Sequence, residues 1–114
     1  MTDAIVIISA FPDEDGATRC ADALVGEGLA ACVQVQGPIR STFRWKGAVD
    51  HATEWFCQVK TSRGRYPAVE HRIRALHPYE VPEIIALPVV AGNPAYLRWV
   101  GESVADMEGD SPRS

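Results

Sequence analysis

The sequence predicts a single α+β domain whose elements follow the order strand, helix, strand, strand, helix, strand. Its 114 residues suffice for one hydrophobic core but not for two independent ones. The apolar run at residues 4–11 has the composition and length of a buried strand. Two later segments, 13–27 and 66–76, carry apolar residues at helical spacing. Between them, residues 39–60 alternate as the strands of a long hairpin do.

The first strand and the first helix adjoin at Pro12, where the apolar run ends. Acidic residues from Asp13 onward suit the positive end of a helix, and Gly26 and Gly28 end the helical pattern. The apolar positions between these limits are Ala17, Cys20, Ala21 and Leu24. We therefore expect a helix over residues 13–27 with one buried face.

A long hairpin is expected after this helix. Residues 29–36 have the composition of a strand that Gly37 and Pro38 interrupt, because glycine tolerates a bulge and proline cannot donate to the ladder. The strand is expected to bend there and continue through residues 39–45, before KGAVDHATE (46–54) reverses the chain. In the return strand, one face is expected to carry Trp55, Cys57 and Val59, and the other Glu54, Phe56, Gln58 and Lys60.

The second helix is expected to end at His77, because a residue that precedes proline is disfavoured in the α region. Residues 83–90 follow as a fourth strand. Asn93 and Pro94 then provide the cap and first position of a short helix.

This order of elements is that of the ferredoxin-like fold, an antiparallel sheet backed by two helices. We assign the fold to residues 1–104 and expect a flexible tail at residues 105–114. In this topology the fourth strand lies at a sheet edge, and residues 84–87 are apolar on both faces. The hairpin also carries more aromatic surface than two helices can cover, so we expect a homo-oligomer.

Composition and charge argue against several classes of protein. No apolar run approaches the roughly 18–20 residues that span a bilayer, so we expect no direct membrane insertion. The N-terminus lacks a basic leader, which favours a cytoplasmic location. The net charge of −4 opposes binding to a nucleic-acid backbone. Cys20, Cys32 and Cys57 are widely spaced without a C-x-x-C pair, so we expect reduced thiols.

Two rival functions find little support in the residues. Basic side chains at residues 63–74 could contact RNA, but the third strand lacks the aromatic signature of the RNA-recognition motif, and we expect a solvated helix face. No cysteine falls in an expected loop, and neither H-E-x-x-H nor G-x-S-x-G occurs. We therefore expect no enzymatic activity and no organic cofactor.

The segment HPYEVPE (77–83) is the best candidate for a functional site. Imidazole suits Cu(II) and Zn(II), so His77 is the leading candidate metal ligand, with Glu80 and Glu83 near enough in sequence to add oxygen ligands. Two prolines stiffen the segment. The alternative is structural, because a histidine that ends a helix can bind the last carbonyl groups and favours the negative end of the helix dipole.

A ligand cleft between subunits is a second candidate site. Trp45, Trp55 and Tyr79 offer aromatic walls for such a cleft. Lys60 ends a strand, where it could pair with Glu83 or line the cleft. The alternative is that these aromatic residues form the core of a subunit interface.

Several strings together resemble the CutA divalent-cation tolerance proteins: AACVQV, TFRWKG, VKT, HPYEVPEIIALPV and YLRWV. The resemblance covers about residues 4–104 and keeps the family's order of elements. It implies copper binding and a cytoplasmic trimer built like the PII signalling proteins, with hairpins and sheet edges joining the subunits. Some members carry a cysteine assigned to copper near the end of the first strand. This chain has Ser9 there, so we expect Cu(I) to be held less well.

The resemblance therefore implies a divalent-cation tolerance protein that binds copper or another divalent cation, acts as a PII-like trimeric signalling protein, or does both. It names no downstream protein partner. The alternative is a trimer that binds a small molecule or a partner protein, has no metal site of its own, and is linked to metal tolerance only indirectly.

Overall fold

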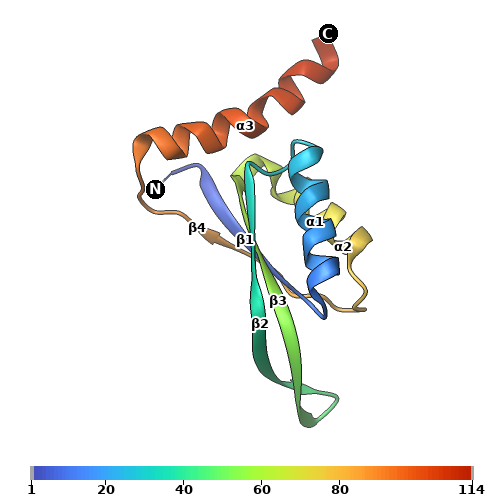
Figure 1. Cartoon of the computed structure of the whole chain (residues 1–114). Helices are drawn as coiled ribbons and strands as arrows, with labels where there is room; N and C mark the ends of the chain where they lie inside the picture. The colour runs from blue at the N-terminus through green and yellow to red at the C-terminus, as the bar shows by residue number, and fades with distance from the viewer. Residues whose placement is uncertain (1, 114) are drawn as a thin grey trace.

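The computed structural model describes residues 2–113, and the side chains of residues 2–105 (Figure 1). Its elements are β1 (Ala4–Phe11), α1 (Glu14–Gly26), β2 (Cys32–Trp45), β3 (Ala48–Ser62), the 3-10 turn η1 (Arg63–Arg65), α2 (Tyr66–Leu76), β4 (Ile84–Pro88) and α3 (Pro94–Arg113). The α+β class and the ferredoxin-like order of elements are thus confirmed.

The four strands form one antiparallel sheet in the order β2-β3-β1-β4, which places β4 at an edge as predicted. Helices α1 and α2 lie side by side on one face of the sheet, and α3 crosses its end beside the N-terminus (Figure 1). Arg65 fixes α3 there, because its Nε and Nη2 atoms donate to Val104 O at 3.0 and 2.6 Å.

The hydrophobic core lies between the sheet and the two helices. β1 supplies Ile7 and Phe11, α1 supplies Leu24, β3 supplies Val59 and α2 supplies Ile73, all of them fully buried. β1 is central, and its inner face is buried against the helices, whereas Val6 and Ile8 on its other face are only half-buried. Asp13 caps α1 by accepting a 2.6 Å hydrogen bond from the Gly16 amide at its Oδ1.

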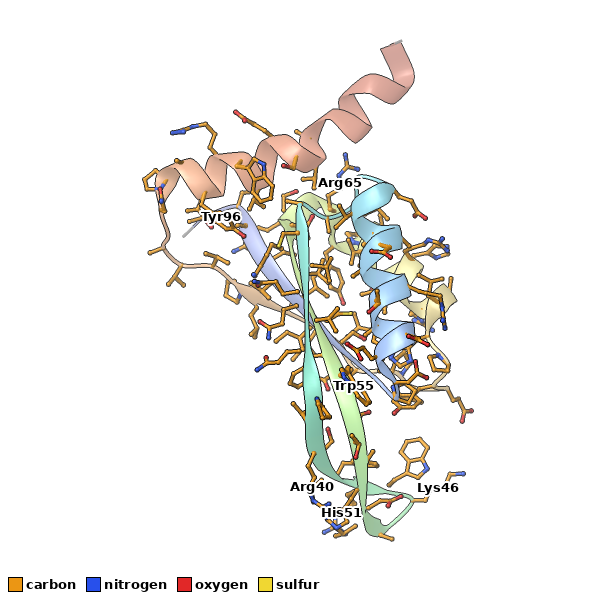
Figure 2. All side chains as sticks on the ribbon, viewed as in Figure 1. Arg40, Lys46, His51, Trp55, Arg65 and Tyr96 are labelled. Carbon is orange, nitrogen blue, oxygen red and sulfur yellow. The ribbon has the colours of Figure 1, made fainter. Side chains whose placement is uncertain are left out.

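Strands β2 and β3 form an arm that extends beyond the helices (Figure 1). The register is shifted between Gln36 and Ile39, which confirms the predicted irregularity around Gly37 and Pro38. Figure 2 shows Arg40, Lys46 and His51 toward the far end of the arm, and Trp55 near the point where it leaves the helices.

The reversal at the tip of the arm is shorter than predicted. Residues 46–54 were expected to turn the chain, but only Lys46 and Gly47 separate the two strands. Both residues have positive φ, 51° and 82°. Such a turn matches the twist of paired strands, so the ladder continues to the Trp45–Ala48 pair.

The C-terminal helix is longer than the short helix predicted, with 20 residues in α3. Its backbone runs through most of residues 105–114, the segment predicted as a tail, and the side chains from residue 106 onward lie outside the described part. The division of the chain at residue 104 stays a prediction. Within the described residues, no helix combines the length and apolar character needed to cross a membrane.

We predict that Gly37→Ala destabilises the fold. A Cβ atom at position 37 would lie 2.3 Å from Trp55 Cδ1, so the indole ring or the strand must shift. Overpacking of this kind lowers the free energy of unfolding by about 1–3 kcal/mol, measurable by urea titration at fixed protein concentration. Gly26→Ala is the control, because no atom lies within 4 Å of its added Cβ. Equal stability of the two variants would contradict the prediction.

Candidate functional site

A groove of about 750 Å³ lies between the arm and the loop that follows α2. Phe43 and Trp45 of β2 and Tyr79 of the loop give it aromatic walls. These three side chains remain partly exposed, at 39%, 45% and 36%. The groove is large enough for a small molecule or a hydrated ion.

Glu54 is the one buried polar side chain among the described residues that line the groove. Only 8% of this residue is exposed, and both carboxylate oxygens accept hydrogen bonds. The Ser41 hydroxyl donates to Oε1 at 2.6 Å, and the Tyr79 hydroxyl donates to Oε2 at 2.8 Å. Burial raises the pKa of Tyr79 to about 12, and the Glu54 carboxylate adds to this shift. The phenol therefore stays protonated and keeps donating.

Three further carboxylates line the groove: Asp50, Glu80 and Glu83. Partial desolvation raises the pKa of Glu83, and the nearby negative charge of Glu54 raises it further. The ion pairs found among the described residues, Arg72–Glu27 and Arg74–Glu70, involve none of the groove's carboxylates. The described residues that line the groove thus include four carboxylates and no Lys or Arg side chain, a composition that favours cations.

His77 lies behind this groove with both ring nitrogens engaged. Nδ1 accepts a 3.1 Å hydrogen bond from the Tyr79 amide, so the proton of the neutral ring is on Nε2. Nε2 donates to Ala10 O at 2.7 Å, and the ring stacks on Phe11 at 4.2 Å between centroids. Burial lowers the pKa of His77, while the Ala10 hydrogen bond and the Glu54 charge oppose this shift. The imidazole thus joins the loop to β1 and does not bind the last carbonyl groups of α2.

The structure gathers only some of the predicted site residues. Tyr79, Trp45, Glu80 and Glu83 line the groove, but His77, Lys60 and Trp55 do not. Lys60 Nζ donates to Gln34 Oε1 at 2.5 Å. No ion pair between Lys60 and Glu83 occurs among the described side chains. Trp55 packs against Gly37.

Sequence reasoning missed Glu54, which it placed on a strand face without a role. The irregularity after Gln36 sets Ile39 opposite Glu54, and Ser41 and Tyr79 then cover the carboxylate. The available signal was an acidic residue inside a strand rich in aromatic side chains, where an isolated charge is unfavourable. The sequence pattern did not show that Ser41 and Tyr79 would bind this carboxylate.

The donors present fit a hard divalent cation better than copper. Glu54 and Glu83 offer oxygen atoms, which suit Mg²⁺, Mn²⁺ and similar ions. The imidazole nitrogen that Cu(II) favours accepts the Tyr79 amide in this chain. Among the side chains of residues 2–105, no group of three or more His, Cys, Asp or Glu is placed to hold a metal ion. An ion at Glu54 and Glu83 would complete its shell with water or with groups of another molecule.

The chain is thus a small α+β protein with an aromatic-walled groove that carries several carboxylates. Residues 5–103 match the family model described as CutA1 divalent ion tolerance protein. The chain belongs to this family.

Relatives of known name support this assignment. The divalent-cation tolerance protein CutA of Thermus thermophilus is 44% identical, over 86% of this chain and 95% of that protein. Human protein CutA is also 44% identical, over 83% of this chain and 55% of the human protein, so the chain spans about half of that relative. The CutA crystal structure from Xylella fastidiosa has a TM-score of 0.88 and 38% identity, and the comparison covers 90% of this chain and 99% of that one.

We predict that His77 makes stability depend on pH. Its pKa in the folded chain lies below the ordinary value of 6.5, so the unfolded chain binds more protons in the window between these two values. The contribution is fully present above pH 6.5 and is lost as the pH falls through the folded pKa. In His77→Gln, urea titrations between about pH 7.5 and 5.5 should show a shallower loss of stability. His71→Gln, at an exposed position, should keep the wild-type slope.

We also predict that Tyr79→Phe destabilises the loop at neutral pH. The substitution removes one of the two hydroxyl donors to the buried Glu54 carboxylate. The free energy of unfolding should fall by about 1–3 kcal/mol, since hydrogen bonds to charged groups contribute on this scale. Tyr96→Phe on α3 is the matched control and should change stability by less than about 0.5 kcal/mol. Similar losses of unfolding free energy in both variants would show that the hydrogen bond from Tyr79 to Glu54 does not stabilise the fold.

Proposed function

We propose that this member of the divalent ion tolerance family binds a divalent cation in the groove, beside Glu54 and Glu83. The main supporting observation is that both carboxylates line the same groove, where burial, and after it the like charge of Glu54, raises the pKa of Glu83. A bound cation would replace this repulsion with attraction on both carboxylates. It would also compensate the charge of Glu54, a nearly buried group with only neutral hydrogen-bond donors.

Copper, predicted from the family resemblance, would meet a less suitable donor set. Cu(II) could use the groove's oxygen atoms, but it would gain His77 only by displacing the Tyr79 amide from Nδ1. We therefore propose a site of limited selectivity, in which oxygen ligands and water hold the ion. Such a site would serve tolerance by responding to a rise in free divalent cations without catalysing a reaction.

We further propose that the protein works as a PII-like homotrimer in the cytoplasm. Apolar side chains remain exposed on the arm and on the edge strand β4, among them Val49 at 61%, Ile85 at 47% and Leu87 at 46%. Association of copies would bury these surfaces and the free strand edges. Since β2 of the arm is also a wall of the groove, cation binding would change the position of the arm and offer a signal to a downstream protein.

The second candidate function is a trimer that binds a small organic molecule or a partner protein and has no metal site of its own. The aromatic walls formed by Phe43, Trp45 and Tyr79 favour this alternative, because oxygen-ligated ions need no aromatic surroundings. Its link to metal tolerance would then be indirect.

Calorimetric titration with Mn²⁺, Zn²⁺ and Cu²⁺ tests the cation site. Glu83→Gln should weaken binding about tenfold or more, equivalent to about 1.4 kcal/mol, since the neutral amide removes the charge but keeps the shape. Glu102→Gln, at an exposed position of α3 outside the groove, is the matched control and should bind as the wild type does.

The His77→Ala variant distinguishes a cation site in the groove from one at His77, the metal ligand that the sequence predicts. If binding is lost in His77→Ala and kept in Glu83→Gln, the ion lies at the imidazole and the groove site is wrong. If wild type and Glu83→Gln bind equally weakly, the second candidate function gains support.

A further inference from the structure

One face of the arm combines aromatic rings with carboxylates. Phe43 of β2 lies opposite Asp50 of β3 in the ladder, and opposed residues of paired strands project from the same face. Residues two or four positions away along either strand share that face, which therefore also carries Trp45 and Glu54. These four side chains all line the groove. The groove thus extends along the arm from Glu54 toward the tip.

The two carboxylates of this face are far apart. Asp50 and Glu54 are four positions apart on β3, and a rise of about 3.3 Å per residue places their backbone atoms roughly 13 Å apart. Charges at this separation interact weakly at physiological ionic strength, where the Debye length is about 8 Å. A single metal ion beside Glu54 and Glu83 therefore leaves Asp50 and the aromatic walls without a role.

The components of the groove suit an organic ammonium group. Each Glu54 oxygen accepts a hydrogen bond from one neutral hydroxyl, and a carboxylate has about four acceptor positions, so Glu54 can accept further hydrogen bonds. The Trp45 ring already lies near an ammonium group, because Lys46 Nζ is 5.8 Å from its centroid. Aromatic faces attract ammonium groups at this distance. The described residues that line the groove include no basic side chain that would repel such a ligand.

We propose that the groove binds a linear aliphatic polyamine that lies along the arm. One ammonium group pairs with Glu54 and Glu83, and another pairs with Asp50. The methylene chain between them packs on Phe43 and Trp45, which are 39% and 45% exposed. The inference rests on the proposed function, because it uses the same carboxylates, and it names an organic ligand for that site.

The same geometry defines what the groove selects. Binding requires positive charges at both ends of an apolar chain, so a neutral diol of similar length lacks both ion pairs. A diamine much shorter than the separation between Asp50 and Glu54 reaches only one of these carboxylates. A divalent cation and the polyamine compete, because both use Glu54 and Glu83.

Calorimetric titration of the full chain with spermidine tests the inference. The wild type should bind spermidine, bind the shorter putrescine several-fold more weakly, and not bind the neutral α,ω-octanediol. Asp50→Asn and Trp45→Leu should each weaken spermidine binding several-fold, through loss of an ion pair and of a cation–π contact respectively. Trp99→Leu is the matched control, because Trp99 of α3 is also 45% exposed but lies outside the groove. Equal spermidine affinity in Trp45→Leu and Trp99→Leu, or in Asp50→Asn and the wild type, would overturn the proposal.

Mn²⁺ titrations of the same variants separate this inference from the divalent-cation site. Asp50→Asn and Trp45→Leu should bind Mn²⁺ as the wild type does, because the ion uses Glu54 and Glu83, and spermidine should displace the ion. If the wild type binds Mn²⁺ but not spermidine, the polyamine inference is wrong and the divalent site is retained. If it binds spermidine but not Mn²⁺, the divalent site is wrong and the groove is a site for organic cations. Binding of neither ligand would refute both.

Discussion

The central position of β1 is the constraint on which the rest of the structure depends. β3 pairs with one edge of this strand and β4 with the other, and α1 and α2 cover its inner face. Every inward side chain of β1 is therefore buried. Its carbonyl groups also bind other segments, as Ala10 O does with the His77 ring and Ala4 O with the Val89 amide. The hydrophobic core and the loop after α2 are both positioned relative to this strand.

A continuous series of hydrogen bonds leads from β1 to the groove. Ala10 O accepts from the His77 ring, the ring accepts from the Tyr79 amide, and the Tyr79 hydroxyl donates to Glu54. Ser41 completes the series from the arm. The imidazole therefore acts as a positioning group, because it fixes the loop backbone that presents Tyr79 to the carboxylate. The shape of the groove thus depends on the packing of the core as well as on the exposed loop.

The proposed ion site lies in an accessible groove that offers carboxylate oxygens. Hard divalent ions suit such donors. Phe43 and Trp45 of β2 line the groove, and the same arm carries exposed apolar residues such as Val49. If copies of the chain associate through these residues as proposed, occupancy of the groove and assembly would influence each other.

The sequence by itself determined the order of elements, the bounds of β1, the edge position of β4 and the family, because these follow from hydrophobic periodicity, proline and glycine positions, and local strings. It also identified Tyr79, Glu80 and Glu83 as a polar segment. Only the tertiary structure decided which groups meet. It enclosed Glu54 between Ser41 and Tyr79 and engaged both nitrogens of His77. The physical reason is that the groups that bury a side chain or bind it come from segments distant in the chain. How these segments pair depends on the irregularity between Gln36 and Ile39 and on the tight turn at Lys46 and Gly47, which the local sequence pattern predicts only in part.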